Sequence, residues 1–199
     1  FNGVQPSAEV ADAFEAAVAV FAALGAVVTR AAPPSAPEAL RRLALGRAAL
    51  TVRSIGSAER ALLDPAVLLA AREGEQLSAL AYVDAEAERA AYTAQVAAFF
   101  EGHDLLLTPT VAHVAPAIDV EAASRRPSYA APFSWTRQPA ISVPAGLGSG
   151  GAGGARLPIG LQIVGRHFDD AFVLAAAQAY EAQAGHLDDL RRRALALRA

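Results

Sequence analysis

The sequence contains no cysteine, no methionine and no lysine. Without cysteine the chain has no disulfide framework, no thiolate nucleophile and no thiolate metal site. Without lysine it supplies no Schiff base, no P-loop lysine and no lysine general base. All 17 basic residues are arginine, a preference that a GC-rich coding bias also explains. Because the chain starts at Phe1 and lacks methionine, we expect its N-terminus to be cut.

The chain also lacks a large net charge and long apolar runs. The formal net charge is -3 at pH 7, which gives no electrostatic footprint for nucleic acid. No apolar run approaches the roughly 20 residues that a membrane-spanning helix needs. We therefore predict no direct nucleic-acid partner, no membrane partner and a cytoplasmic location. Small apolar residues are abundant instead: 54% of the residues are hydrophobic and alanine is prominent, which suits helices packed closely on a sheet.

The N-terminal third reads as helices with one short strand. Apolar residues at helical spacing predict a first helix that Ser7 caps and Gly25 ends. We expect its stripe to pack into the core: Val10, Phe14, Ala17, Val18, Phe21 and Leu24. A strand over Ala26–Thr29 should follow, stopped by Pro33 and Pro34. Residues 35–61 look helical with solvated arginines, and their buried candidates are Leu40, Leu43, Leu50 and Ile55.

Two more helices precede a strand. Asp64 and Pro65 are typical of a helix start, and that helix should end at Gly74. Ser78 then opens a long helix that Gly102 closes, with Tyr82, Ala90, Val96 and Phe99 as inward candidates. Leu105–Leu107 predicts a fully buried strand of the parallel-sheet kind. The Thr108-Pro109-Thr110 segment leaves the strand end, where ligand sites in open α/β sheets occur, and 111–131 should form a long loop.

The C-terminal part predicts two strands and a helix. The strands are Ala140–Val143 and Ile159–Val164, joined by GLGSGGAGG. This loop contains a G-x-G-x-x-G match, but the dinucleotide fingerprint needs a helix after it, and here a β-rich run follows. We interpret it as a flexible connection. Asp169 or Asp170 should cap a last helix ending at Gly185, and a short helix with solvated arginines should follow. The fold class is α/β, with a mixed β-sheet core covered by helices.

No set of residues forms a complete active site. The histidines His103, His113, His167 and His186 lack metal spacing, so we predict no metal, and we also predict no cofactor. Only His113, in the long loop, is considered for substrate contact, against the plainer interpretation of an exposed histidine. Composition does not exclude a Ser-His-Asp site. There is no G-x-S-x-G elbow, however, and Ser142 lies within an apolar strand where a nucleophile is hard to reach.

Four segments, in order from about residue 1 to 181, resemble the C-terminal portion of the amidase signature family. They are FNGVQPSAEVADAFEAAVAVFAALGAVV, DLLLTPTVAHVAP, PFSWTRQPAISVPAG and LPIGLQIVGRHFDDAFVLAAAQAYE. The resemblance implies that 1–199 is the C-terminal part of a single amidase domain of α/β/α fold. It also implies a Ser–cis-Ser–Lys triad that hydrolyses carboxamide C–N bonds. That triad belongs to the family's N-terminal half, so no catalytic residue is carried over and the chain alone should be inactive.

A wall of the substrate channel can be carried over by resemblance. It comprises Phe133, Ser134, Trp135 and Thr136, with Thr108 and Thr110 as secondary candidates. Trp135 offers a flat apolar face to an acyl or aromatic substrate, or else packs in the core. Ser134 replaces the family's usual asparagine. Arg137 replaces its usual glycine and either pairs with an acidic substrate or lies on the surface.

Two other functions stay open. The chain could belong to the glutamine-hydrolysing A-type subunit of a tRNA-dependent amidotransferase, which would need partner subunits. It could also be a non-catalytic α/β binding or scaffold module. The expected partner is a small-molecule amide, and the protein could also form a homodimer. If the sheet is shared with a missing half, Leu105–Leu107 and Ile141–Val143 should expose apolar edges and favour association.

Overall fold

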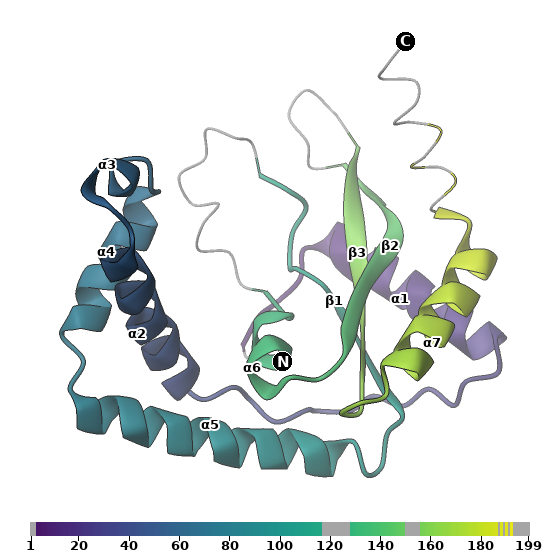
Figure 1. The fold of residues 1–199 in the computed structure, drawn as a ribbon. Helices are drawn as coiled ribbons and strands as arrows, with labels where there is room; N and C mark the ends of the chain where they lie inside the picture. The colour runs from purple at the N-terminus through teal and green to yellow at the C-terminus, as the bar shows by residue number, and fades with distance from the viewer. Residues whose placement is uncertain are drawn as a thin grey trace. The chain divides into compact units, whose positions relative to one another are not determined.

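A computed structural model describes residues 3–116, 128–149 and 156–186, together with 188, 190 and 192. Contacts divide the chain into two compact units. The helical unit is Pro34–Val96, and the sheet unit combines Phe1–Pro33 with Ala97–Ala199. Figure 1 traces the chain through both, and each unit is described by itself. That 1–199 belongs to a single amidase domain stays a prediction.

The helical unit contains α2 (Ala39–Ser54), α3 (Ser57–Arg60), α4 (Pro65–Glu75) and most of α5 (Ala79–Phe99). The predicted caps are confirmed: the Ala66 N–H donates to Asp64 Oδ1 at 2.7 Å, and the Ala81 N–H donates to Ser78 Oγ at 3.1 Å. Helices α2 and α4 approach closely because Gly74 has no side chain. A Cβ there would lie 2.0 Å from the Leu45 carbonyl oxygen.

Burial in the helical unit follows the predicted stripes only in part. Leu40 and Leu43 are buried, whereas Leu50 is 68% exposed and Ala90 is also exposed. Leu50 shares a helix face with Leu43 but lies two turns further along α2. Periodicity identifies the face of a helix, but how far a neighbour covers that face is set by tertiary packing. The predictions for Leu50 and Ala90 were therefore wrong.

Three strands form the sheet of the sheet unit: β1 (Leu105–Pro109), β2 (Ala140–Gly148) and β3 (Leu157–Gly165). Their order is β1-β3-β2, and both pairings are antiparallel. The predicted hairpin of β2 and β3 is confirmed, which rules out a dinucleotide loop between a strand and a helix. Strand β1 is not of the parallel kind that its apolar run suggested. It is also not fully buried: β1 lies at the edge of the sheet, and Leu105 and Leu107 are half-buried.

Helices α1 (Ala8–Ala23) and α7 (Asp170–Ala184) lie together on one side of the strands, and α6 (Ala131–Thr136) lies on the other (Figure 1). Side chains alternate between the faces of a strand. Leu161 and Ile163 of β3 therefore join Val10, Phe21 and Tyr180 in the apolar core. We call the side under α1 and α7 the apolar face and the side under α6 the polar face.

The helices α1 and α7 begin and end where predicted, but the Ser7 side chain makes no cap hydrogen bond and one predicted strand does not form. Gly25 and Gly185 have φ values of 91° and 67°, the left-handed conformation that ends a helix. Asp169 is the N-cap residue of α7. Residues 26–29, however, adopt no strand, and Val27 is 94% exposed. A strand forms only where a neighbour pairs its N–H and C=O groups, and none of the described strands pairs with this segment.

Three sequence predictions lie wholly or partly outside the described residues. These are residues 117–127 of the long loop predicted over 111–131, residues 150–155 at the glycine-rich connection, and parts of the C-terminal helix. In the predicted C-terminal helix, residues 186, 188, 190 and 192 are helical.

Three apolar residues of α1 and α7 lie at the margins of the apolar core. Leu24, Phe172 and Leu174 are 44%, 44% and 59% exposed.

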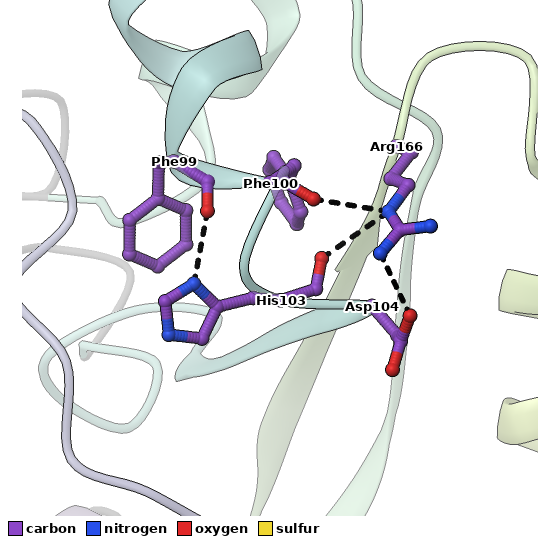
Figure 2. A network of polar contacts seen from close by, with 5 residues as sticks. All are labelled: Phe99, Phe100, His103, Asp104 and Arg166. Carbon is purple, nitrogen blue, oxygen red and sulfur yellow. Dashed lines mark hydrogen bonds and ion pairs between the residues drawn. The ribbon is translucent and has the colours of Figure 1, made fainter.

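Arg166 fixes the junction between the end of α5 and the sheet (Figure 2). Its Nε donates to the carbonyl oxygens of Phe100 at 3.0 Å and His103 at 3.3 Å, and its Nη2 lies 2.8 Å from Asp104 Oδ1. The His103 ring nitrogen Nδ1 lies 2.9 Å from the Phe99 carbonyl oxygen. Carbonyls at a helix C-terminus lack intrahelical partners, so these contacts satisfy them and position β1 beside β3.

Candidate functional site

The polar face is organised around Gln162 in the central strand. The antiparallel register places Thr108 of β1 opposite Gln162 on one side and Ser142 of β2 opposite it on the other. Because strand side chains alternate, all three project to the face away from α1 and α7. The sequence favours this arrangement locally, since each residue is a single polar position within an apolar strand.

Gln162 forms the buried floor of the site. Its side chain is 3% exposed, and its Nε2 donates to Thr108 Oγ1 at 2.9 Å and to the Tyr129 carbonyl oxygen at 3.3 Å. The Tyr129 hydroxyl donates to the Val4 carbonyl oxygen at 3.2 Å, and burial raises the pKa of that hydroxyl. The segment that enters α6 is therefore attached both to the sheet and to the N-terminal segment.

A pair of hydroxyls lies beside this floor. Thr110 Oγ1 and Ser142 Oγ are 2.6 Å apart. They meet over Gly160, where a Cβ would lie 2.7 Å from Thr110 Oγ1 and 2.8 Å from Ser142 Oγ. The Thr110 N–H also donates to the Gly160 carbonyl oxygen at 2.9 Å. Glycine at position 160 is thus required for the two hydroxyls to approach each other across β3.

Ser142 is exposed, which contradicts the expectation that it would be hard to reach within an apolar strand. Its side chain is on the polar face while its apolar neighbours project to the core. Its hydroxyl is paired with another neutral hydroxyl, and neither group is a base that could remove a proton at neutral pH. This pair suits hydrogen bonding to a ligand better than nucleophilic attack.

A hollow of about 300 Å³ opens between this face and α6. Of the four residues predicted to contact substrate, Phe133 and Ser134 line it, whereas Trp135 and Thr136 do not. Phe133 and Thr136 are 1% exposed, and the Thr136 hydroxyl donates to the Pro132 carbonyl oxygen at 3.3 Å. Trp135 is half-buried. Successive side chains of a helix point about 100° apart, so one turn cannot direct all four into one hollow.

Several lining residues were not found from the sequence. Gln138, Ser142 and Gln162 line the hollow together with Thr110, a secondary candidate from the sequence. Thr108, opposite Gln162 on β1, does not line it. Period-two alternation could have identified Ser142 and Gln162 as polar positions on one face. No sequence pattern identifies Gln138, because its place depends on how α6 joins β2.

A second hollow, of about 430 Å³, adjoins the first at Gln138. Its other lining residues include Phe100, Glu101, Arg166 and His167. His167 Nε2 lies 2.6 Å from the Thr136 carbonyl oxygen, and Arg166 is held by the contacts in Figure 2. We take the smaller hollow as the candidate site because five polar residues from different parts of the chain line it.

Other kinds of site find no support within the part of the chain that the structure describes. His113 is exposed and does not line either hollow. No group of three or more His, Asp and Glu side chains among the described residues could hold a metal ion. None of the described helices combines the length and apolarity needed to cross a bilayer.

The chain is similar in sequence to amidases and related proteins. A profile of the family described as Amidase matches residues 1–174. A Rhodococcus erythropolis protein, described as an uncharacterized protein in the nthA 5′ region, is 41% identical over 102 residues, or 47% of this chain and 46% of that protein. The A-type subunit of the Streptococcus gordonii glutamyl-tRNA(Gln) amidotransferase is 39% identical over 88 residues, or 42% of this chain and 17% of that protein.

A solved structure described as that of an amidase superposes with a TM-score of 0.72 at 27% identity, over 90% of this chain and 43% of that one. This likeness confirms the predicted fold class. The chain thus spans less than half the length of each of these relatives.

Proposed function

This chain belongs to the amidase signature family, and from that premise we propose that it is the C-terminal part of an amidase that hydrolyses carboxamide C–N bonds. The Ser–cis-Ser–Lys triad that the family resemblance implies would be supplied by residues outside 1–199, since this sequence has no lysine. The role of this chain is to bind and orient the substrate. The polar hollow beside α6 is the part of the substrate site that it contributes.

One observation carries this proposal: the hydrogen-bonding groups that converge on the hollow are neutral. Thr110 and Ser142 offer hydroxyls beside the ring of Phe133, and the lining that the structure describes contains no charged side chain. Charged ligands such as phosphates favour arginine, lysine or a helix N-terminus. Neutral donors and acceptors next to an apolar wall suit a small neutral amide.

The four predicted substrate residues take different roles within this proposal. Phe133 supplies the apolar wall and Ser134 a hydroxyl at the rim. Thr136 acts indirectly, because its hydroxyl bonds to the Pro132 carbonyl and stabilises the single turn of α6. Trp135 is placed on the same turn and would meet only a substrate that extends past the hollow.

A second candidate is the glutamine-hydrolysing A-type subunit of an amidotransferase. Its support is the 39% identity to the Streptococcus gordonii protein over 88 residues. This function predicts stable association with further subunits. Co-purification of the complete gene product with a second subunit favours it, and a lone enzyme or a homodimer favours the simple amidase. The cytoplasmic location likewise stays a prediction.

The test begins with the complete coding sequence that contains residues 1–199. We expect it to encode an upstream lysine and a Gly/Ser-rich segment with two serines. The purified product should release ammonia from small carboxamides, whereas residues 1–199 alone should not. Absence of both upstream features, or of hydrolysis across a panel of aliphatic and aromatic amides, contradicts the proposal.

Ser142→Ala separates binding from catalysis in the same enzyme. Removing one neutral hydrogen bond to a ligand weakens binding by about 0.5–1.5 kcal/mol, so we expect KM to rise up to about tenfold with kcat largely kept. Thr110→Val, which removes the partner hydroxyl, is the matched variant. Loss of kcat by several orders of magnitude in Ser142→Ala alone would instead make Ser142 a nucleophile.

A further inference from the structure

Helix α6, which carries Phe133 and forms one wall of the smaller hollow, is too short to be stable by itself. It has 6 residues, whereas isolated helices shorter than about 12–15 residues are marginal in water. Its N-cap residue, Ala130, supplies no side-chain hydrogen bond, and its last residue is followed by Arg137 in a left-handed conformation. The position of α6 therefore depends on contacts with other parts of the chain.

The entry to α6 is held by Gln162 of β3. Gln162 Nε2 donates to the carbonyl oxygen of Tyr129, just before α6 begins, at 3.3 Å and to Thr108 Oγ1 at 2.9 Å. A carbonyl oxygen can only accept, so this contact fixes the orientation of the amide, and both Nε2 hydrogens are used. The Gln162 side chain is 3% exposed. The backbone that enters α6 is thus attached to the central strand of the sheet.

The exit from α6 is held by His167, which follows β3. Its Nε2 lies 2.6 Å from the carbonyl oxygen of Thr136, the last residue of α6, so Nε2 carries a proton and donates it. Carbonyls in the last turn of a helix lack intrahelical partners, and His167 satisfies this one, in a residue that is 1% exposed. The backbone beside His167 is itself fixed, because Arg166 is held by the contacts in Figure 2.

We propose that Gln162 and His167 are positioning residues that hold the two ends of α6 and so fix the Phe133 wall of the substrate site. Both belong to one chain segment, β3 and the turn after it, which also carries Gly160 beneath the pair of hydroxyls. The separation between the apolar wall and the hydroxyls is therefore set by a single strand. The effect on substrate binding rests on the amidase function proposed above, whereas the effect on α6 does not.

His167 offers a matched pair of variants. Glutamine is long enough to place an amide N–H where histidine has Nε2, whereas asparagine is one methylene shorter and does not reach the Thr136 carbonyl. Because His167 is only half-buried, both variants should fold. In the complete enzyme, His167→Asn should raise KM for small carboxamides about 2- to 10-fold with kcat largely kept, as expected for one lost neutral hydrogen bond.

His167→Gln should keep the hydrogen bond and leave KM within about twofold of the parent. The control is His186→Asn, the same substitution at a histidine that lines neither hollow and follows the end of α7. It should leave both kcat and KM unchanged.

Trp135, the only tryptophan in residues 1–199, lies within α6 and gives a readout that does not depend on hydrolysis. The complete enzyme is labelled with fluorotryptophan, and Trp135→Phe identifies the fluorine resonance of this residue. The parent and His167→Gln should give one narrow resonance at the same position. His167→Asn and Gln162→Met, which release the exit and the entry of α6, should broaden or split it.

These measurements separate failure of this inference from failure of the proposed function. If the enzyme hydrolyses amides but His167→Asn leaves KM unchanged, or lowers kcat instead, His167 is not a positioning residue. An unchanged Trp135 resonance in His167→Asn or in Gln162→Met overturns the inference as well. If the parent hydrolyses no amide, the amidase proposal fails, and the fluorine resonance alone decides whether the two contacts hold α6.

Discussion

The two faces of the three-stranded sheet are built from the same strands, but one is held by apolar packing and the other by hydrogen bonds between side chains. On the apolar face, Leu161 and Ile163 are completely buried against α1 and α7. On the polar face, Gln162 bonds to Thr108, and hydroxyls meet over Gly160 beneath α6. The apolar face gains its stability from close packing, whereas the polar face keeps a hollow and hydrogen-bonding groups.

Among the described residues of the sheet unit, the buried polar side chains without a hydrogen-bond partner are Ser7, Gln138 and Tyr180, and the last two occupy contrasting positions. The Tyr180 hydroxyl and the Gln138 amide both lack a hydrogen-bond partner within the described residues. Tyr180 lies in the core and lines neither hollow, while Gln138 lines both. Each of these groups has lost its hydration without gaining a partner among the described residues, so each reduces stability.

The largest expected effect is loss of packing on the apolar face. Leu161→Ala removes a side chain that is 0% exposed in the middle of β3, and it should lower the free energy of unfolding by about 3 kcal/mol. Leu174→Ala, at a position that is 59% exposed, is the control and should change it by less than about 0.5 kcal/mol. Urea unfolding measures both, and similar values would mean that the apolar face is not the stabilising one.

The next effect is on the polar face, at the close approach of the hydroxyls. Gly160→Ala places a Cβ 2.7 Å from Thr110 Oγ1 and 2.8 Å from Ser142 Oγ, so we expect a loss of about 1–3 kcal/mol. Combining it with Ser142→Ala removes one of the clashing atoms. The double variant should therefore be more stable than the sum of the single effects predicts. Additive effects in the double-mutant cycle would contradict this geometry.

Tyr180→Phe should stabilise the apolar face, by about 1 kcal/mol at neutral pH, because an unpaired hydroxyl is removed while the stacking on Phe21 is kept. Burial also raises the pKa of Tyr180 from 10.0 to about 12. Between these values the unfolded chain loses the proton and the folded chain keeps it, so the free energy of unfolding falls as pH rises.

The decrease in the free energy of unfolding at alkaline pH should be smaller in Tyr180→Phe than in the parent. It should not disappear, because burial raises the pKa of Tyr92 in the helical unit to about 12 as well. Urea titrations at pH 8, 10 and 11 measure the slope. An equal slope in the parent and the variant would show that the Tyr180 hydroxyl ionises freely in the folded protein.

The smallest effect concerns the backbone at Arg137, which holds a left-handed conformation beside the polar hollow. This conformation costs a non-glycine residue about 1–2 kcal/mol, and the extra freedom of glycine in the unfolded chain offsets about half of that. Arg137→Gly should therefore stabilise the protein by about 0.5–1 kcal/mol. Arg137→Ala removes the same side chain but keeps the strain, so a gain of equal size in both variants would contradict this explanation.

The sequence predicted the elements better than their arrangement. Caps at Asp64 and Ser78 and the left-handed glycines at positions 25 and 185 depend on neighbours within a few residues, and all of them form as predicted. Leu50 and Ala26–Thr29 failed because burial and strand pairing depend on what lies opposite in space. For the candidate site, resemblance pointed to α6, and two of its four predicted residues line the hollow.

By itself, then, the sequence determined most of the helices (though not α6), the hairpin, the absence of lysine and cysteine chemistry, and the family resemblance. The helices and the hairpin follow from short-range periodicity and the missing chemistry from composition, whereas the resemblance comes from four segments in family order. Only the tertiary structure decided that β1 pairs antiparallel with β3, that Thr110 meets Ser142 over Gly160, and that the Gln138 amide is buried without a partner among the described residues. The physical reason is that such contacts join residues tens of positions apart, and no local pattern encodes the distance between them.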